Sequence, residues 1–220
     1  MRSTYAVLGF VFLFCNYAMA DNAFFAANGK SGSIKLPEGM CDITETGKGA
    51  IIASFLEERS RTSGKAMPRL ELVLADCSNP SAGYPWGWVG VAEEDATGLA
   101  QSLFNRYISR QLESLIAEVS AQIGARDALQ EFEQSSGVRI DGLENGKPLI
   151  LESNNDAFIF ALPQSATLNG EEVSEVILTS SMVRNGRLVH VYIYESQAEG
   201  ASILRFSEEL KKISKTLHVR

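Results

Sequence analysis

The dipeptide Asn185-Gly186 constrains the fold of this chain most strongly, because it separates two runs in which apolar and polar residues alternate. Asn-Gly favours the left-handed backbone of a two-residue hairpin turn, and alternation with a period of two is typical of a half-buried strand. Residues 172–196 are therefore predicted to form a β-hairpin. Its second strand presents side chains to two faces, Val189, Val191 and Ile193 to one and His190, Tyr192 and Tyr194 to the other.

Other periodic segments predict helices and strands around this hairpin. An apolar stripe at helical spacing predicts a long helix from Thr97 to about Ile123, resuming to about Gln134, and shorter helices are predicted after Gly49 and after Gly200. Strands are predicted at 34–36, 68–77, 86–91, around 149–151 and around 158–162, and the glycine-rich residues 141–147 are expected to form a solvated turn. Since consecutive hairpins imply antiparallel pairing, the predicted fold class is α+β, a mainly antiparallel sheet flanked by amphipathic helices.

The first residues have the three-part pattern of a secretory signal peptide. Arg2 precedes a mostly apolar run, and Ala18-Met19-Ala20 gives a small-residue cleavage site. The run is shorter than the roughly 20 apolar residues that span a bilayer. A lipid-modified Cys15 is the alternative, which the bulky Phe14 before it disfavours. We therefore expect a periplasmic or secreted protein with a signal peptide at 1–20, a flexible N-terminal segment at 21–33 and a single α+β domain at 34–220.

The charge of the chain argues against two classes of partner. The 220 residues carry a formal charge of −7, which becomes about −8 when Arg2 is removed with the signal peptide. An acidic protein has no electrostatic attraction for nucleic acid or for anionic lipid. We therefore expect no nucleic-acid partner and no stable membrane insertion after signal cleavage. The expected partner is another protein of the cell envelope.

Cys41 and Cys77 are the cysteines that remain after cleavage near Ala20. In an oxidising compartment two cysteines most simply form one disulfide, here closing a loop of 36 residues. The bond is predicted to pin the start of the first helix to the end of the strand that follows it. A thiol nucleophile needs a nearby base, and zinc needs about four ligands in spaced pairs, which the sequence lacks. No cofactor and no metal are expected.

Aromatic residues supply the candidate binding site. Trp86 and Trp88 share one face of a predicted strand, close to Tyr84, and neighbouring glycines leave room for a flat ligand such as a sugar. The alternative is that the tryptophans pack in the core, as most do. The best polar cluster is His190 with Tyr192 and Tyr194, where Glu195 would make the histidine a candidate base. Its alternative is a half-exposed sheet face without chemistry.

Three segments carry a resemblance to known proteins: PEGMC at 37–41, LADC at 74–77 and VRNGRLVHVYIY at 183–194. Together they resemble a group of uncharacterised exported bacterial proteins, and the order of elements is similar to that of the PsbP-like sandwich. The resemblance implies an accessory or binding role in an envelope or photosynthetic compartment. It brings no catalytic motif, so it implies no site residue.

The sequence leaves three functions open. The leading hypothesis is a soluble accessory or binding protein that acts through protein–protein contact, since no motif of a serine hydrolase, zinc protease or nucleotide-binding loop is present. The second is a small periplasmic hydrolase or carbohydrate-binding enzyme that uses carboxylates or His190. The third is an inhibitor of a secreted enzyme, which sequence does not distinguish from the first.

Overall fold

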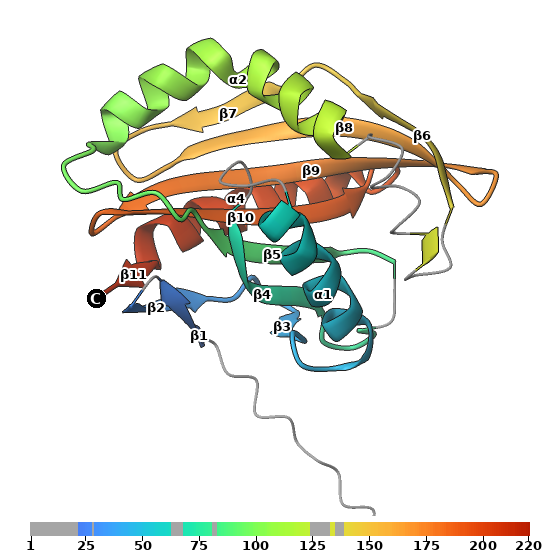
Figure 1. The fold of residues 1–220 in the computed structure, drawn as a ribbon, viewed down its shortest axis with the longest axis horizontal. Coiled ribbons are helices and arrows are strands. Elements are labelled where there is room, and N and C mark those ends of the chain that lie inside the picture. Colours follow the sequence, from blue (N-terminus) through green and yellow to red (C-terminus); the bar gives the residue numbers. More distant parts are fainter. Residues whose placement is uncertain (1–21, 28, 63–67, 81–82, 124–132, 135–138) are drawn as a thin grey trace, which may run out of the picture.

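The structure is a computed structural model that describes residues 22–27, 29–62, 68–80, 83–123, 133–134 and 139–220 (Figure 1). The predicted signal peptide, Cys15 and the continuation of the long helix through 124–132 lie outside the described residues. No helix in the described part of the chain is long and apolar enough to cross a membrane.

Two antiparallel sheets form the body of the fold. The large sheet runs, in spatial order, through β3 (Met40–Asp42), β4 (Arg69–Asp76), β5 (Trp86–Val91), β10 (Arg187–Ser196), β9 (Glu171–Arg184), β8 (Phe158–Leu168) and β6 (Ile140–Asn145), and β7 (Leu149–Ser153) also pairs with β8. The small sheet contains β1 (Asn22–Ala27), β2 (Lys30–Lys35) and β11 (His218–Val219). The helices are α1 (Gly47–Thr62), α2 (Gln101–Ile123) and α4 (Gly200–Thr216). The predicted α+β class with a mainly antiparallel sheet is confirmed.

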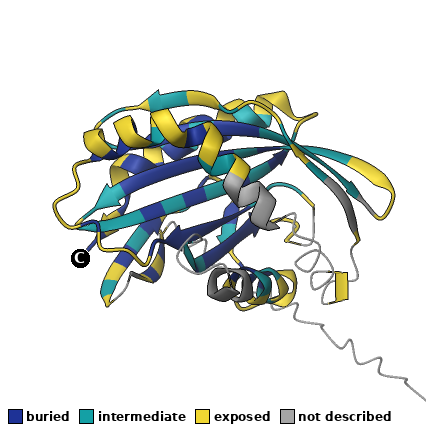
Figure 2. Ribbon diagram, turned by 45° about the horizontal axis from the view of Figure 1, so that its top comes forward, coloured by how far each residue is buried: buried dark blue, intermediate teal, exposed yellow. Residues whose placement is uncertain are grey.

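The two faces of the large sheet are covered by different elements. Leu56 of α1 packs with Val73 and Trp88, and Phe104 of α2 packs with Phe158, so both helices lie on one face. Leu210 of α4 packs on the opposite face, in a cluster that also includes side chains of the small sheet. Figure 2 shows the buried residues concentrated in the strands and the exposed ones on the outer sides of the helices.

The hairpin that the sequence predicts at Asn185-Gly186 is confirmed. Asn185 and Gly186 have φ angles of 47° and 75°, and Arg187 lies opposite Arg184 in the ladder between β9 and β10. A second Asn-Gly pair, Asn169-Gly170, has φ angles of 51° and 86° and joins β8 to β9. The same turn chemistry therefore builds a three-stranded meander at the centre of the sheet.

The described part of the N-terminal segment, residues 22–27 and 29–33, contains strands where the sequence predicts a flexible segment. Residues 22–27 form β1 and residues 30–35 form β2, paired from Asn22 opposite Lys35 to Ala27 opposite Lys30. The ring of Phe25 fills the space that a side chain at Gly32 would occupy, because a Cβ there would lie 2.2 Å from it. Small residues in this segment therefore make close packing possible.

Two further boundaries differ from the prediction. Residues 140–145 form β6 along β8, where a solvated turn was expected, because β8 extends past its apolar core to Leu168 and offers pairing partners. Helix α2 begins at Gln101 rather than Thr97. Gly98 has a φ angle of 81°, which belongs to a turn and not to a helix.

The disulfide between Cys41 and Cys77 is confirmed, with 5.1 Å between the two Cα atoms. Its position differs from the prediction, because Cys41 lies in β3 and not at the start of α1. Cys41 is opposite Ala75 in the ladder, and Cys77 directly follows β4. The bond therefore joins an edge strand to its neighbour in the large sheet.

One buried hydroxyl gives a prediction about stability. Ser180 lies in β9 between Val191 and Ile159, is fully buried, and its hydroxyl has no hydrogen-bond partner among the described residues. We expect Ser180→Ala to raise the free energy of unfolding by up to about 1 kcal/mol in urea denaturation, because it removes an unsatisfied polar group. Ser202→Ala is the matched control and should lower the free energy of unfolding, because the Ser202 hydroxyl donates a hydrogen bond to buried Glu195 at 2.5 Å. A loss of stability in Ser180→Ala would contradict the argument.

Candidate functional site

The predicted aromatic residues form two stacked pairs across β5 and β10. The ladder places Trp86 opposite Tyr194 and Trp88 opposite Tyr192. The ring centroids lie 3.9 Å apart in the first pair and 4.1 Å in the second, with interplanar angles of 8° and 16°. The indole N–H of Trp88 also donates to the hydroxyl of Tyr194 at 3.4 Å. The structure thus brings together two sets of residues that the sequence analysis treated separately.

These stacked pairs face the protein's own interior rather than an open ligand site. Trp88 is only 4% exposed and packs in a cluster with Ala53 and Leu56 of α1, and Trp86 is half-buried beside it. A Cβ at Gly90 would lie 2.5 Å from the indole of Trp88. The glycine therefore makes room for the tryptophan itself, where the sequence analysis considered room for a ligand.

Tyr84 lies outside the stacks and is held by Glu175. Its hydroxyl donates to Oε2 of Glu175 at 2.7 Å, and a cis peptide bond joins Tyr84 to Pro85. Burial raises the pKa of Tyr84, and the hydrogen bond to Glu175 raises it further. Burial also raises the pKa of Glu175, although the hydrogen bond from Tyr84 lowers it. The hydrogen bond joins the segment before β5 to β9.

The polar cluster contains a Ser–His pair without a carboxylate. His190 lies opposite Ser181 in the ladder, and its Nδ1 is 2.9 Å from the Ser181 hydroxyl. The expected partner Glu195 is on the other face, because residues five apart in a strand point to opposite sides. Its carboxylate accepts from the N–H of Ser196 and the hydroxyl of Ser202 instead. The predicted His190–Glu195 pairing is therefore wrong.

The geometry gives little support to the hydrolase hypothesis. Ser181 is 4% exposed, and no carboxylate orients His190 among the described residues. A serine nucleophile needs a base that is itself oriented by a third group. The described residues also contain no group of three His, Cys, Asp or Glu side chains arranged to hold a metal ion. The Ser–His contact is best explained as a cross-strand hydrogen bond.

His190 leads to a prediction about pH. Burial lowers its pKa to about 4 from an ordinary 6.5, so the folded protein keeps it neutral while the unfolded chain takes up a proton. The free energy of unfolding should therefore be at its full value above about pH 6.5, where His190 is neutral in both the folded and the unfolded chain. It should fall as the pH decreases from 6.5 toward 4. Over the interval from pH 7 to pH 5 we expect a loss on the order of 2 kcal/mol in the free energy of unfolding. Urea denaturation between pH 7 and 5 should show a flatter dependence of stability on pH for His190→Gln than for the wild type. An equal slope in the two proteins would contradict this.

A groove of about 870 Å³ lies on a different part of the molecule, where the sequence predicted no site. It is bounded by β1, the connection from β2 to β3, β3 itself and the C-terminal half of α4. Residues that line it include Phe24, Leu36, Met40, Cys41, Asp42 and Lys212. Phe24 is 77% exposed, and the half-buried disulfide forms part of the wall. The sequence signal for this groove is the Phe24-Phe25 pair in the N-terminal segment.

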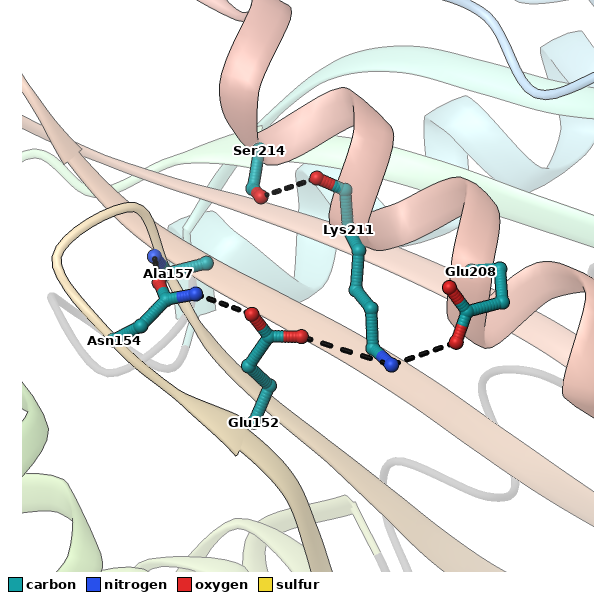
Figure 3. Close-up of polar contacts among 6 residues, drawn as sticks. All are labelled: Glu152, Asn154, Ala157, Glu208, Lys211 and Ser214. Atoms are coloured by element: carbon teal, nitrogen blue, oxygen red, sulfur yellow. Dashed lines mark hydrogen bonds and ion pairs between the residues drawn. The ribbon is translucent and has the colours of Figure 1, made fainter.

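The two lysines next to each other on α4 serve different surfaces. Lys212 lines the groove and forms an ion pair with Glu209 at 2.6 Å, and this hydrogen bond raises the pKa of Lys212. Lys211 lies 2.7 Å from Glu208 and 3.7 Å from Glu152 of β7. Figure 3 shows Lys211 between these two carboxylates, with Asn154 bonded to Glu152. Lys211 therefore ties α4 to the β7–β8 hairpin, and Lys212 belongs to the groove.

Comparison with known proteins gives distant structural likeness alone. No protein-family description and no curated protein match the chain. The solution structure of cyanobacterial PsbP (CyanoP) from Synechocystis sp. PCC 6803 is similar over 93% of this chain and 96% of that one, with 11% identity and a TM-score of 0.38. The predicted similarity to the PsbP-like sandwich is therefore supported only as a weak structural likeness. The fold assignment rests on the strand pairing described above, and the comparison assigns no function.

Proposed function

We propose that this chain is an exported accessory or binding protein that acts through contact with another protein. The observation that supports this most is the groove beside β1, with the exposed ring of Phe24 at its wall. Exposed aromatic side chains next to a concave apolar surface are typical of protein contact sites. The groove replaces residues 84–91 as the candidate contact surface, because Trp88 is buried.

The groove fits a protein partner better than a small substrate. Sites for small substrates gather polar groups whose pKa values are strongly shifted. Among the residues that the structure describes, strong pKa shifts belong to groups that include Tyr84, His190 and Tyr192, which line no part of the groove. The groove instead offers strand backbone, apolar side chains and a few exposed charges.

A photo-crosslinking experiment tests this function. Benzoylphenylalanine would replace Phe24 in the processed protein, within its own cell envelope, and Leu149 on β7 would carry the same group as a matched exposed control. We expect one discrete adduct from position 24 and none from position 149. The captured protein would then be purified and its affinity measured directly. No adduct from position 24, or the same adducts from both positions, would contradict the proposal, and capture of a secreted enzyme whose activity falls would identify the inhibitor form of it.

A further inference from the structure

We propose that the groove binds an extended polypeptide segment of the partner by β-strand addition, between the outer edges of β1 and β3. This inference rests on the proposed function and names the form in which the partner is recognised. It follows from backbone groups, on two strands that both line the groove, for which the described residues supply no hydrogen-bond partner.

The first free edge belongs to β1, the outer strand of the small sheet. Ala26 shows which way this edge points, because its N–H donates to Glu71 and its carbonyl accepts from Arg69, both outside the small sheet. Backbone groups of residues two apart point to the same side of a strand. The N–H and C=O of Phe24 therefore point outward as well. They have no hydrogen-bond partner among the described residues, and Phe24 lines the groove.

The second free edge belongs to β3, the outer strand of the large sheet. Its inner side is identified by two bonds to the β4 segment, from the N–H of Ile43 to the carbonyl of Val73 and from the N–H of Cys77 to the carbonyl of Gly39. The N–H and C=O of Asp42 point the other way by the same alternation. The part of the chain that the structure describes supplies no partner for them, and Asp42 also lines the groove.

An extended chain is the ligand whose chemistry matches two such edges. Its own N–H and C=O groups alternate from side to side, so one segment can donate to and accept from both strands, and main-chain bonds of this kind supply affinity in strand addition. A free strand edge is otherwise a liability that proteins shield with charges, bulges or covering elements. In this chain the side chains of Arg69 and Glu71 cover the edge at Ala26 but leave it open at Phe24.

The side chains around the groove indicate the composition of the segment. An added strand presents alternate side chains to two sides. The groove offers apolar groups such as Leu36 and Met40, and its carboxylates Glu38 and Asp42 outweigh Lys35, because Lys212 is already paired with Glu209. The segment that fits alternates apolar and basic residues. A second copy of this chain fits less well, since the 220-residue chain carries a formal charge of −7 and its processed form about −8, so two copies repel.

The experiment uses the full processed protein and a defined probe, an acetylated and amidated octapeptide of alternating valine and lysine. Phe24→Pro removes the outward N–H of β1 without removing a bond to β2, which an edge strand tolerates. Phe24→Ala is the matched control, because it removes the ring but keeps the N–H. We expect Phe24→Pro to weaken binding at least tenfold, and clearly more than Phe24→Ala. N-methylation of the probe at alternate residues, or glutamate in place of lysine, should also weaken binding at least tenfold.

Hydrogen exchange provides a readout that does not depend on any variant folding. Saturating probe should slow exchange of the amides of Phe24 and Asp42 in the wild-type protein at least tenfold. Unchanged exchange at both amides, or equal affinity of Phe24→Pro and wild type, would overturn strand addition. A concentration-dependent dimer with a protected Phe24 amide and no probe would overturn it in favour of self-pairing. If position 24 still crosslinks one partner in any of these cases, the proposed function stands and only the mode of recognition fails.

Discussion

Trp88→Ala is expected to lower the free energy of unfolding by about 3–5 kcal/mol, the range found when a buried aromatic residue is truncated to alanine. Trp88 is 4% exposed, stacks on Tyr192 at 4.1 Å and packs against α1, so its removal leaves a cavity between helix and sheet. Urea denaturation followed by circular dichroism measures the change. Trp88→Phe should recover part of the loss, because it keeps a stacked ring but not the hydrogen bond to Tyr194.

Trp86 provides a matched control on the same strand. It stacks on Tyr194 at 3.9 Å but is only half-buried, so Trp86→Ala should cost less than Trp88→Ala. Neither variant should change binding of the alternating peptide once folding is taken into account, because neither residue lines the groove. A stable Trp88→Ala variant that loses partner binding would contradict this account and restore the tryptophans as a contact surface.

Removal of the disulfide is expected to have an effect of similar size. The bond closes a loop of 36 residues, for which chain entropy predicts roughly 4 kcal/mol of stabilisation. The double variant Cys41→Ser with Cys77→Ser should therefore lose up to that amount in urea denaturation. Because Cys41 lies in the wall of the groove, the same variant should also bind the alternating peptide more weakly at temperatures where it stays folded.

Reduction of the wild-type protein is the control for this prediction. The reduced wild type and the double variant should unfold at the same urea concentration, since both lack the covalent link and keep side chains of similar size. If the free energies of unfolding of the oxidised wild type and the double variant agree within about 0.5 kcal/mol, the expected stabilisation by the disulfide is contradicted.

Local signals in the sequence predicted the elements that form locally. The Asn185-Gly186 turn, the stripe along α2 and the alternation in β10 all appear in the structure as expected, because each depends on residues close together in the chain. The Asn169-Gly170 turn carried the same signal and was overlooked. The sequence also predicts that Glu195 lies on the face opposite His190, because side chains alternate along a strand.

The groove was not predictable in the same way. Its walls come from residues 22–24 and 35–42, from Cys77 and from one side of α4 between Glu209 and Thr216, and only the pairing of distant segments brings them together. The β1–β2 hairpin lacks an alternating pattern of its own, and its stability comes from Phe25 and Ala23 packing into the core beneath α4. The pKa shift of His190 likewise depends on burial by elements far away in the sequence.

The pairing of β11 with β2 imposes an order of events on the biosynthesis of this protein. The N–H and C=O of Arg220 are bonded to Ser31 at 2.8 Å and 3.2 Å, and His218 and Val219 lie opposite Ser33 and Gly32. The small sheet therefore reaches its final form only after residues 218–220 have been synthesised and have joined the rest of the chain. A chain truncated before residue 218 should lack the third strand of the small sheet, so the support that β11 gives to β2 and β1 would be missing.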